Sequence, residues 1–327
     1  MNRNGGRSRW ALLAAAWMVA AAWMVAASAL AAEEGQGGFR LATFSADVTI
    51  PLGHRCMGVL PTKSKKIVDP LFAHGFVLLG SDKPIVFCAV DWCEIRNDAY
   101  DQWRDALAEA AGTSRERTLV CSVHQHDAPV VDAAAAALLA EAGLKGELYD
   151  VAFHQRVVER VALAVKQSLK NPRPITHLGM GQAKVERIAS NRRVVLPGGR
   201  AAFNRYSRSG GDKFHREQPE GLIDPFLKTL SFWNGDEAAL ALHVYATHPM
   251  SSYGRGEVSA DFVGMARARR QRDDPAVKQI YASGCSGDVT AGKYNDGSPA
   301  MRGVLADRLY DAMKIAMQNA TGQEGAA

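Results

Sequence analysis

The sequence of 327 residues lacks several features that would place it at once in a class of proteins. Its formal net charge is +5, but the basic residues are scattered and no basic run is interleaved with aromatic residues, which argues against nucleic-acid binding. It contains no G-x-S-x-G motif, so the nucleophile turn of many serine hydrolases is missing. Its five cysteines are odd in number and show no zinc-finger spacing. What is present is an ordinary globular composition, with 47% hydrophobic and 22% charged residues.

The N-terminus has the pattern of a secretory signal peptide. Three arginines precede an apolar stretch that contains AAWMVA twice in tandem, and a small-x-small cleavage signature follows it (Arg3, Arg7, Arg9; Trp10–Ala27; Ala29-Leu30-Ala31). We therefore expect residues 1–31 to be removed and the protein to be exported to the periplasm or the outside. An uncleaved membrane anchor is the alternative, since the stretch is just long enough to span a bilayer. We see no later segment apolar enough to cross a membrane.

Export would permit disulfides, although a chain of this length does not need them. Cys88 and Cys121 lie in apolar runs and are expected to be small buried residues. A single disulfide that involves Cys56, Cys93 or Cys285 is left open, because the sequence does not select a pair.

Strand and helix patterns alternate along the chain, which predicts an α/β fold with a mixed, largely parallel sheet flanked by helices. We expect a disordered linker over 32–39, one catalytic domain over 40–320, and a disordered tail over 321–327. A Gly- and Arg-rich loop over 190–222 is the longest stretch without a clear pattern, and long loops in compact domains are often functional. The predicted strands are 40–50, 72–80, 84–91, 118–123, 175–188, 226–233, 238–247 and 277–283, and the predicted helices are 97–111, 132–145, 149–169, 259–272 and 299–319.

Four predicted core strands end in residues that can carry chemistry. Asp91 follows one strand, His124-Gln125-His126-Asp127 the next, His248 the third, and the run from Ser286 to Thr290 the fourth. In open α/β sheets, ligands bind at the carboxyl ends of the strands. We therefore expect these side chains to converge on one site.

The His-x-His spacing suits a metal, because residues i and i+2 of an extended chain point to the same side. Each element alone has an ordinary explanation: structural or surface histidines, a histidine before a turn at Pro249, a helix cap at Asp91, and a turn at Asp288. Together they predict a metal centre. Imidazole nitrogens with a carboxylate suit zinc best, and bound zinc turns water into a nucleophile at neutral pH.

The same segments, in the same order, resemble the N-terminal catalytic region of neutral/alkaline non-lysosomal ceramidases, which are zinc amidases that cleave the N-acyl bond of ceramide. The resemblance extends from about Ala42 to Asn295. It is carried by SADVTIPLG with Met57-Gly58, CAVDW (88–92), CSVHQHDAPVV (121–131), Asn191-Arg192-Arg193, the strand Ile223–Trp233, THPMSS (247–252) and GDVTAGKYN (287–295).

The resemblance implies roles for particular residues. His124 and His248 match the zinc-binding histidines, and His126 matches a histidine near the substrate. Thr290 stands where the family has a catalytic serine, and with Arg193 it would position the substrate carbonyl or the developing oxyanion. A Glu and a Tyr from later in the family's sequence complete the zinc site there. For this chain we expect carboxylates instead, with Asp91 and Asp288 favoured over the other candidates, Asp127 and Asp261.

The resulting prediction is an exported, zinc-dependent hydrolase of an amide (N-acyl) or ester bond. Its expected partner is a small-molecule or lipid-like N-acyl substrate, with peripheral membrane contact as an open alternative. Two other functions compete with it: a ligand-binding relative that has lost catalysis, and a metal-independent serine hydrolase that uses Ser286.

Overall fold

The computed structural model describes residues 38–57 and 60–324. The predicted signal peptide, residues 1–31, lies outside them, as does most of the predicted linker. Within the described part of the chain, no helix combines the length and the apolar character needed to span a bilayer.

A first five-stranded sheet is built mainly from the N-terminal half. Its order is β6-β4-β3-β1-β8, from β1 (Arg40–Asp47), β3 (Phe72–Leu79), β4 (Ile85–Val90), β6 (Thr118–Ser122) and β8 (Arg173–Pro174). The predicted pairing of the second and third strands around the turn at 81–83 is confirmed, since β3 and β4 are antiparallel neighbours. Only β4 and β6 are parallel.

A second five-stranded sheet is built from the C-terminal half. Its order is β16-β14-β13-β9-β18, from β9 (His177–Lys184), β13 (Phe226–Asn234), β14 (Glu237–Tyr245), β16 (Lys278–Ser283) and β18 (Thr321–Glu324). Again one pair, β14 and β16, is parallel and the others are antiparallel.

The α/β class and the mixed character of the sheets are therefore confirmed, but the expectation of a single, largely parallel sheet is wrong. Short turns join β3 to β4 and β13 to β14, and a tight turn can only return the chain antiparallel. The two parallel pairs arise where a helix connects the strands, α2 (Asn97–Ala111) in one sheet and α6 (Asp261–Asp273) in the other. The predicted tail over 321–327 also differs, because its first four residues pair with β9 as β18.

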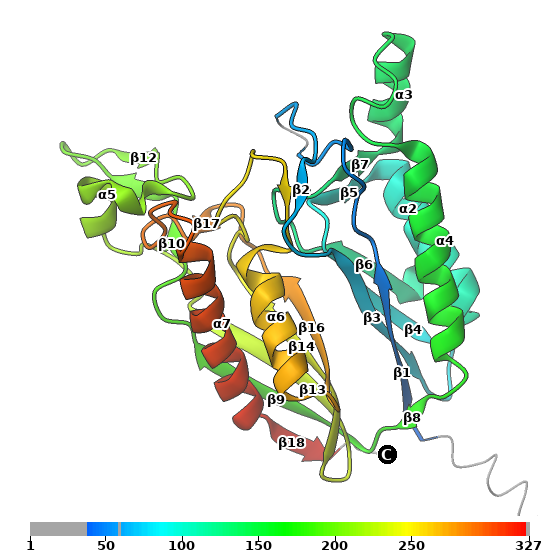
Figure 1. The fold of residues 1–327 in the computed structure, drawn as a ribbon. Coiled ribbons are helices and arrows are strands. Elements are labelled where there is room, and N and C mark those ends of the chain that lie inside the picture. Colours follow the sequence, from blue (N-terminus) through cyan, green and yellow to red (C-terminus); the bar gives the residue numbers. More distant parts are fainter. Residues whose placement is uncertain (1–37, 58–59, 325–327) are drawn as a thin grey trace, which may run out of the picture.

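Helices cover the outer face of each sheet, so that the molecule has four layers in the order helix, sheet, sheet, helix (Figure 1). The helices α2 and α4 (Val151–Ser168) pack on the first sheet, and α6 and α7 (Met301–Gln318) pack on the second. Between the sheets, the rings of Phe76 and Phe232 lie 5.1 Å apart. The helices α2 and α4 each bury one apolar stripe, which explains why the helical period could be recognised in their sequences.

Smaller elements project from one end of this sandwich (Figure 1). The helix α3 (Ala133–Glu141) rises beside the parallel pair β5 (Glu94–Arg96) and β7 (Val130–Asp132). The predicted loop 190–222 forms an arm with β10 (Ser190–Asn191), the hairpin β11 (Arg193–Val195) and β12 (Ala201–Phe203), and α5 (Lys213–Glu217). The arm is tied to the body where β10 pairs with β17 (Val289–Thr290). The remaining elements are the pair β2 (Lys66–Ile67) and β15 (Glu257–Val258), and the 3-10 turns Arg115–Arg117 and Ser209–Gly211.

Candidate metal centre

The carboxyl ends of the two parallel pairs meet at the end of the sandwich from which the arm and α3 project. The hydroxyl of Ser283, the last residue of β16, donates to the carbonyl oxygen of Val123 just after β6, at 2.7 Å. This bond joins the ends of the two sheets. His124 follows directly, and His248 follows β14 at the same end, so the predicted convergence of strand ends holds across two sheets.

His124 and His248 face each other through their Nε2 atoms, which lie 3.2 Å apart. The Nδ1 of His124 donates to the carbonyl oxygen of Cys93 at 2.8 Å, and the Nδ1 of His248 donates to that of Ser286 at 2.6 Å. Because a carbonyl can only accept, both protons reside on Nδ1 and both Nε2 atoms present lone pairs. Two nitrogens at about 2.0–2.1 Å from one tetrahedral zinc would be roughly 3.3 Å apart, so this geometry fits a shared metal. Carbonyl anchors of this kind orient metal-binding histidines.

The surroundings keep His248 neutral. Burial lowers its pKa to about 4, and the nearby positive charge of Arg192 adds to the shift. A neutral imidazole is the form that binds a metal. The backbone of His124 is unusual as well, with a φ of +73°, and such left-handed positions cluster at functional sites.

His126 completes a group of three rings. Its ring centroid lies 5.1 Å from that of His124, 5.7 Å from that of His248 and 5.5 Å from that of Tyr253. Both of its ring nitrogens are buried and have no hydrogen-bond partner, and burial lowers its pKa to about 3. A buried, unpartnered imidazole is costly unless it meets a ligand. His126 thus has free donor and acceptor capacity beside the histidine pair.

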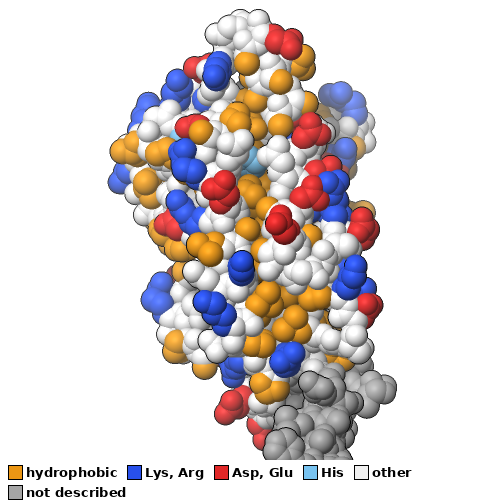
Figure 2. All heavy atoms as spheres, turned by 90° about the vertical axis from the view of Figure 1, so that its right-hand side faces the viewer, with side chains coloured by type: hydrophobic (Ala, Val, Ile, Leu, Met, Phe, Trp, Pro, Cys, Tyr) orange, Lys and Arg blue, Asp and Glu red, His pale blue; other side chains and the backbone are white. Residues whose placement is uncertain are grey.

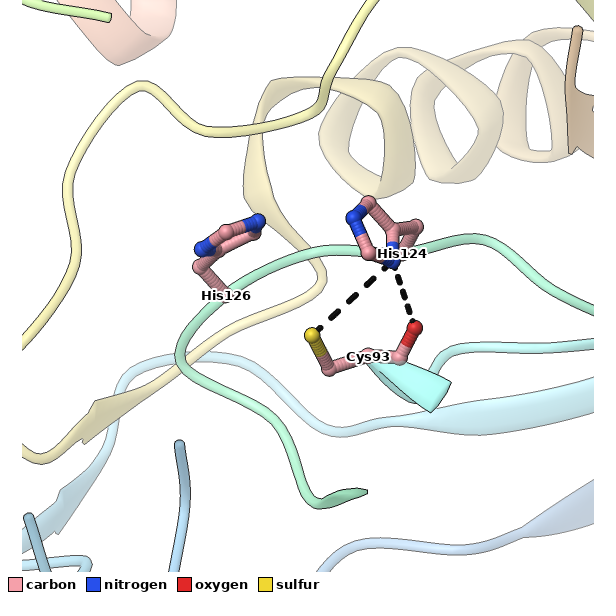
Figure 3. A group of neighbouring side chains, drawn as sticks. All are labelled: Cys93, His124 and His126. Carbon is pink, nitrogen blue, oxygen red and sulfur yellow. Dashed lines mark hydrogen bonds between the residues drawn. The ribbon is translucent and has the colours of Figure 1, made fainter. Parts of the chain in front are cut away.

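Cys93 offers a competing grouping. Among the described residues, Cys93, His124 and His126 are the only three potential ligands whose atoms all lie within 4.8 Å of one another (Figure 3). The thiol, however, approaches the Nδ1 of His124, which already bonds to the Cys93 carbonyl, and burial raises the thiol's pKa. The pair of facing Nε2 atoms therefore fits a metal better than this group does. All five cysteines are free.

The predicted carboxylates are held elsewhere. Both oxygens of Asp91 accept from the guanidinium of Arg267, at 2.7 and 2.6 Å, and neither residue is exposed. Asp288 pairs with Arg193 near the surface. The contacts of Asp91 and Asp288 do not favour their predicted role as metal ligands.

The two alternative carboxylates have partners as well. Asp127 accepts from the backbone N–H of Gly254, and Asp261 accepts from the backbone and hydroxyl of Ser251. Burial raises the pKa of Asp127 to about 6. The carboxylate beside the histidines is that of Glu94, 3.9 Å from the Nδ1 of His124, which is the side away from His248.

The arm brings a different arginine from the predicted Arg193 close to the histidines. Arg192, not the exposed Arg193, is the cation whose charge lowers the pKa of both His126 and His248. Its Nε is buried without a partner, and burial lowers its own pKa. Arg192 lies between β10 and β11, and Arg193 is the first residue of β11. Neighbouring side chains of an extended chain point to opposite sides, so two adjacent arginines in the motif do not indicate which one faces inward.

Thr290 lies where the sequence predicted, beside the histidines. Its backbone bridges to that of His248, and its side chain is fully buried with no partner for the hydroxyl. A cavity of about 240 Å³ opens next to His124 and His126, with Met57, Glu94 and Leu148 among its lining residues. A larger groove of about 640 Å³ on β9, β13 and β14 contains no histidine, cysteine or carboxylate in its lining.

No protein-family model and no curated protein matches the sequence. Among solved structures, the chain is similar to neutral ceramidase from Pseudomonas aeruginosa, with a TM-score of 0.67 and 17% identity over 89% of this chain and 46% of that one. A structure described as a ceramidase complexed with C2 matches with a TM-score of 0.65 and 16% identity, over 89% and 45%. The chain thus spans about half the length of these proteins. At this identity the likeness establishes the fold, and the ceramidase-like fold expected from the motifs is confirmed.

Proposed function

We propose that this chain is a zinc-dependent hydrolase of an amide or ester bond in an N-acyl, lipid-like substrate. The observation that carries the proposal is the pair of imidazoles with both Nδ1 atoms bound to carbonyls and both Nε2 atoms facing each other at 3.2 Å. Two lone pairs at this distance repel each other unless a cation lies between them. The fold shared with ceramidases adds support, because N-acyl hydrolysis is the chemistry of those proteins.

Zinc held by His124 and His248 would supply Lewis acidity for a water molecule and for the scissile carbonyl. His126, which is neutral and has both nitrogens free, would orient the substrate beside the metal by donating or accepting a hydrogen bond. Arg192 and the hydroxyl of Thr290 would hold the carbonyl oxygen as negative charge develops on it. Arg193, bound to Asp288, would steady the arm.

A second candidate is ligand binding without hydrolysis. It is favoured by the engagement of Asp91 and Asp288 with arginines, which leaves two imidazoles as the placed ligands, whereas catalytic zinc usually has three. A chain of this kind would bind zinc and an amphiphile but turn nothing over.

The test measures zinc content and hydrolysis of a panel of N-acyl and ester substrates together. We expect His124→Asn and His248→Gln to lose both zinc and activity, with asparagine chosen because it tolerates a positive φ. The variant His177→Gln, at a half-buried histidine of β9 away from the centre, is the matched control. Zinc binding by wild type without any turnover would favour the second candidate, and zinc binding unaffected by both substitutions would exclude this centre.

We further propose that the protein is exported, on the evidence of residues 1–31. Mass spectrometry of the protein from the periplasmic or extracellular fraction should find an N-terminus near Ala32. Recovery of the intact chain from the cytoplasm alone would contradict export.

A further inference from the structure

The helix α3 exposes an apolar surface that the fold itself does not cover. Eight of its nine residues are alanine or leucine, and none of the nine is buried. Leu138 is 67% exposed, and Leu144, just beyond the helix, is 49% exposed. The helix is nevertheless capped, since the Asp132 carboxylate accepts from the backbone N–H of Ala135. Ala133 and Ala136 pack against the core from one side of the helix, but Leu138 and Leu144 do not. A capped helix that leaves such leucines exposed points to an apolar environment outside the chain.

This helix lies at the mouth of the candidate site. Ala135 of α3 and Leu148, which precedes α4, line the same 240 Å³ cavity as His124 and His126. Whatever covers α3 is therefore positioned to deliver an apolar molecule into that cavity.

The arm projects from the same end of the sandwich and carries positive charge (Figure 1). Residues 190–222 contain seven Arg and Lys residues against three Asp and Glu residues. Arg200, Arg208 and Lys213 are exposed, and they are accompanied by Val195 and Leu222, which are 60% and 89% exposed. Figure 2, which looks onto the side of α3 and α4, shows hydrophobic side chains among both basic and acidic ones toward its upper end. The excess of basic over acidic residues, with exposed apolar side chains among them, is a property of the arm. This mixture is characteristic of surfaces that contact anionic lipid headgroups while inserting apolar side chains.

We propose that α3 and the arm together form a membrane-docking surface for an anionic lipid bilayer, which brings the site's cavity to the lipid. The occupant is assigned by charge complementarity and by apolar exposure at the same end. The biological role of this surface rests on the proposed function: the substrate of the hydrolase would be an amphiphile drawn from the bilayer. The docking itself requires neither zinc nor turnover, so its test is independent of that function.

The test measures binding of the full chain to phosphatidylcholine vesicles with and without phosphatidylglycerol. We expect phosphatidylglycerol to strengthen binding. Leu138→Glu with Leu144→Glu should weaken it by about tenfold or more per leucine. Arg200→Glu with Lys213→Glu should weaken it by about fivefold or more per charge. The matched controls, Leu163→Glu and Lys166→Glu, lie on the exposed side of α4 toward its far end, and they should bind as wild type does.

Hydrogen exchange supplies a local measurement that the apolar N-terminus does not influence. Anionic vesicles should slow amide exchange in α3 and in the arm, and leave the C-terminal half of α4 unchanged. The proposal is overturned if exchange in both elements is unaffected by vesicles, or if the two double variants bind as the controls do. Slowed exchange that depends on protein concentration in the absence of lipid would also overturn it, in favour of a second copy as the occupant.

Discussion

His124 combines a strained backbone with a side chain that is held in one orientation. Its backbone lies in the left-handed region, which costs a histidine free energy, and its side chain is fixed at one nitrogen by the Cys93 carbonyl. Strain of about 1–3 kcal/mol persists at a residue only where the surroundings impose it. Here it aims Nε2 at His248, so the strain and the proposed metal site have the same origin.

Arg192 and Arg193 provide an internal comparison at this scale. We predict that Arg192→Ala lowers kcat/KM for an N-acyl substrate by about 100-fold, because it removes a donor to the developing oxyanion. Arg193→Ala should change kcat/KM by less than about fivefold, since its partner is an exposed carboxylate. Steady-state kinetics of the two variants, with zinc content held equal, makes the measurement. Equal losses in both would contradict the assignment.

The sequence predicted that His124 and His248 converge because strand ends and motif order are local patterns. The sequence did not show which of Arg192 and Arg193 lies beside the histidines, since this depends on which side of the extended chain turns inward. It also could not see that Asp91 is neutralised by Arg267, because the two residues lie 176 positions apart. A pattern within one stretch of sequence contains no information about which distant residue a side chain contacts.

Among the elements, β4 and α6 are joined by the Asp91–Arg267 ion pair, which lies buried at the end of the first sheet. The pair links a strand of one half of the chain to a helix of the other. Breaking a buried pair leaves an uncompensated charge, which is costly.

We predict that Asp91→Asn lowers the free energy of unfolding by about 3–5 kcal/mol, because Arg267 is then buried without its counter-charge. Zinc affinity should stay within about threefold of wild type, because the carboxylate contacts Arg267 and not the histidines. Denaturant titration and zinc titration of the same sample test both parts. A large loss of zinc affinity with little loss of stability would restore Asp91 as a ligand.

Three strands of the second sheet are connected through His243 of β14. Its ring contacts the hydroxyl of Thr229 on β13 at 2.8 Å and the amide oxygen of Gln279 on β16 at 2.9 Å. Burial lowers its pKa from 6.5 to about 4. The unfolded chain therefore binds a proton below pH 6.5 that the folded chain does not bind until about pH 4.

It follows that the free energy of unfolding decreases as the pH falls through this window, by up to about 3 kcal/mol from His243. We predict that His243→Gln, which keeps hydrogen-bonding groups but does not titrate, makes the dependence on pH shallower between 6.5 and 4. The control variant His177→Gln, at a half-buried histidine of β9, should keep the wild-type slope. Chemical denaturation at a series of pH values checks this, and identical slopes in all three proteins would contradict it.

Helices and strands were the most predictable part of the chain. The helix 97–111 was placed at its true bounds because its apolar spacing and the following Gly112 are local signals. The pairing of the strands was not predictable in the same way, because an apolar run does not show which other strand lies next to it in the sheet. The short hairpin of the arm was not predicted, because strands of three residues are too short to show an alternation of apolar and polar residues.

At the scale of the whole molecule, two sheets each contribute the carboxyl ends of one parallel pair to a single site. His124 comes from the first sheet and His248 from the second, so the site exists only when both halves are packed together. The same packing places the arm and α3 on either side of it (Figure 1). Metal binding should accordingly stabilise the whole fold, since a ligand that binds only the native state shifts the folding equilibrium.

The most direct test is the position of the metal in crystals of the zinc-loaded protein, located by anomalous scattering. We predict one peak at about 2.0–2.1 Å from the Nε2 atoms of both His124 and His248. A peak bound instead by the thiol of Cys93 and the Nδ1 of His124, or no peak near the histidines, would contradict the proposed centre.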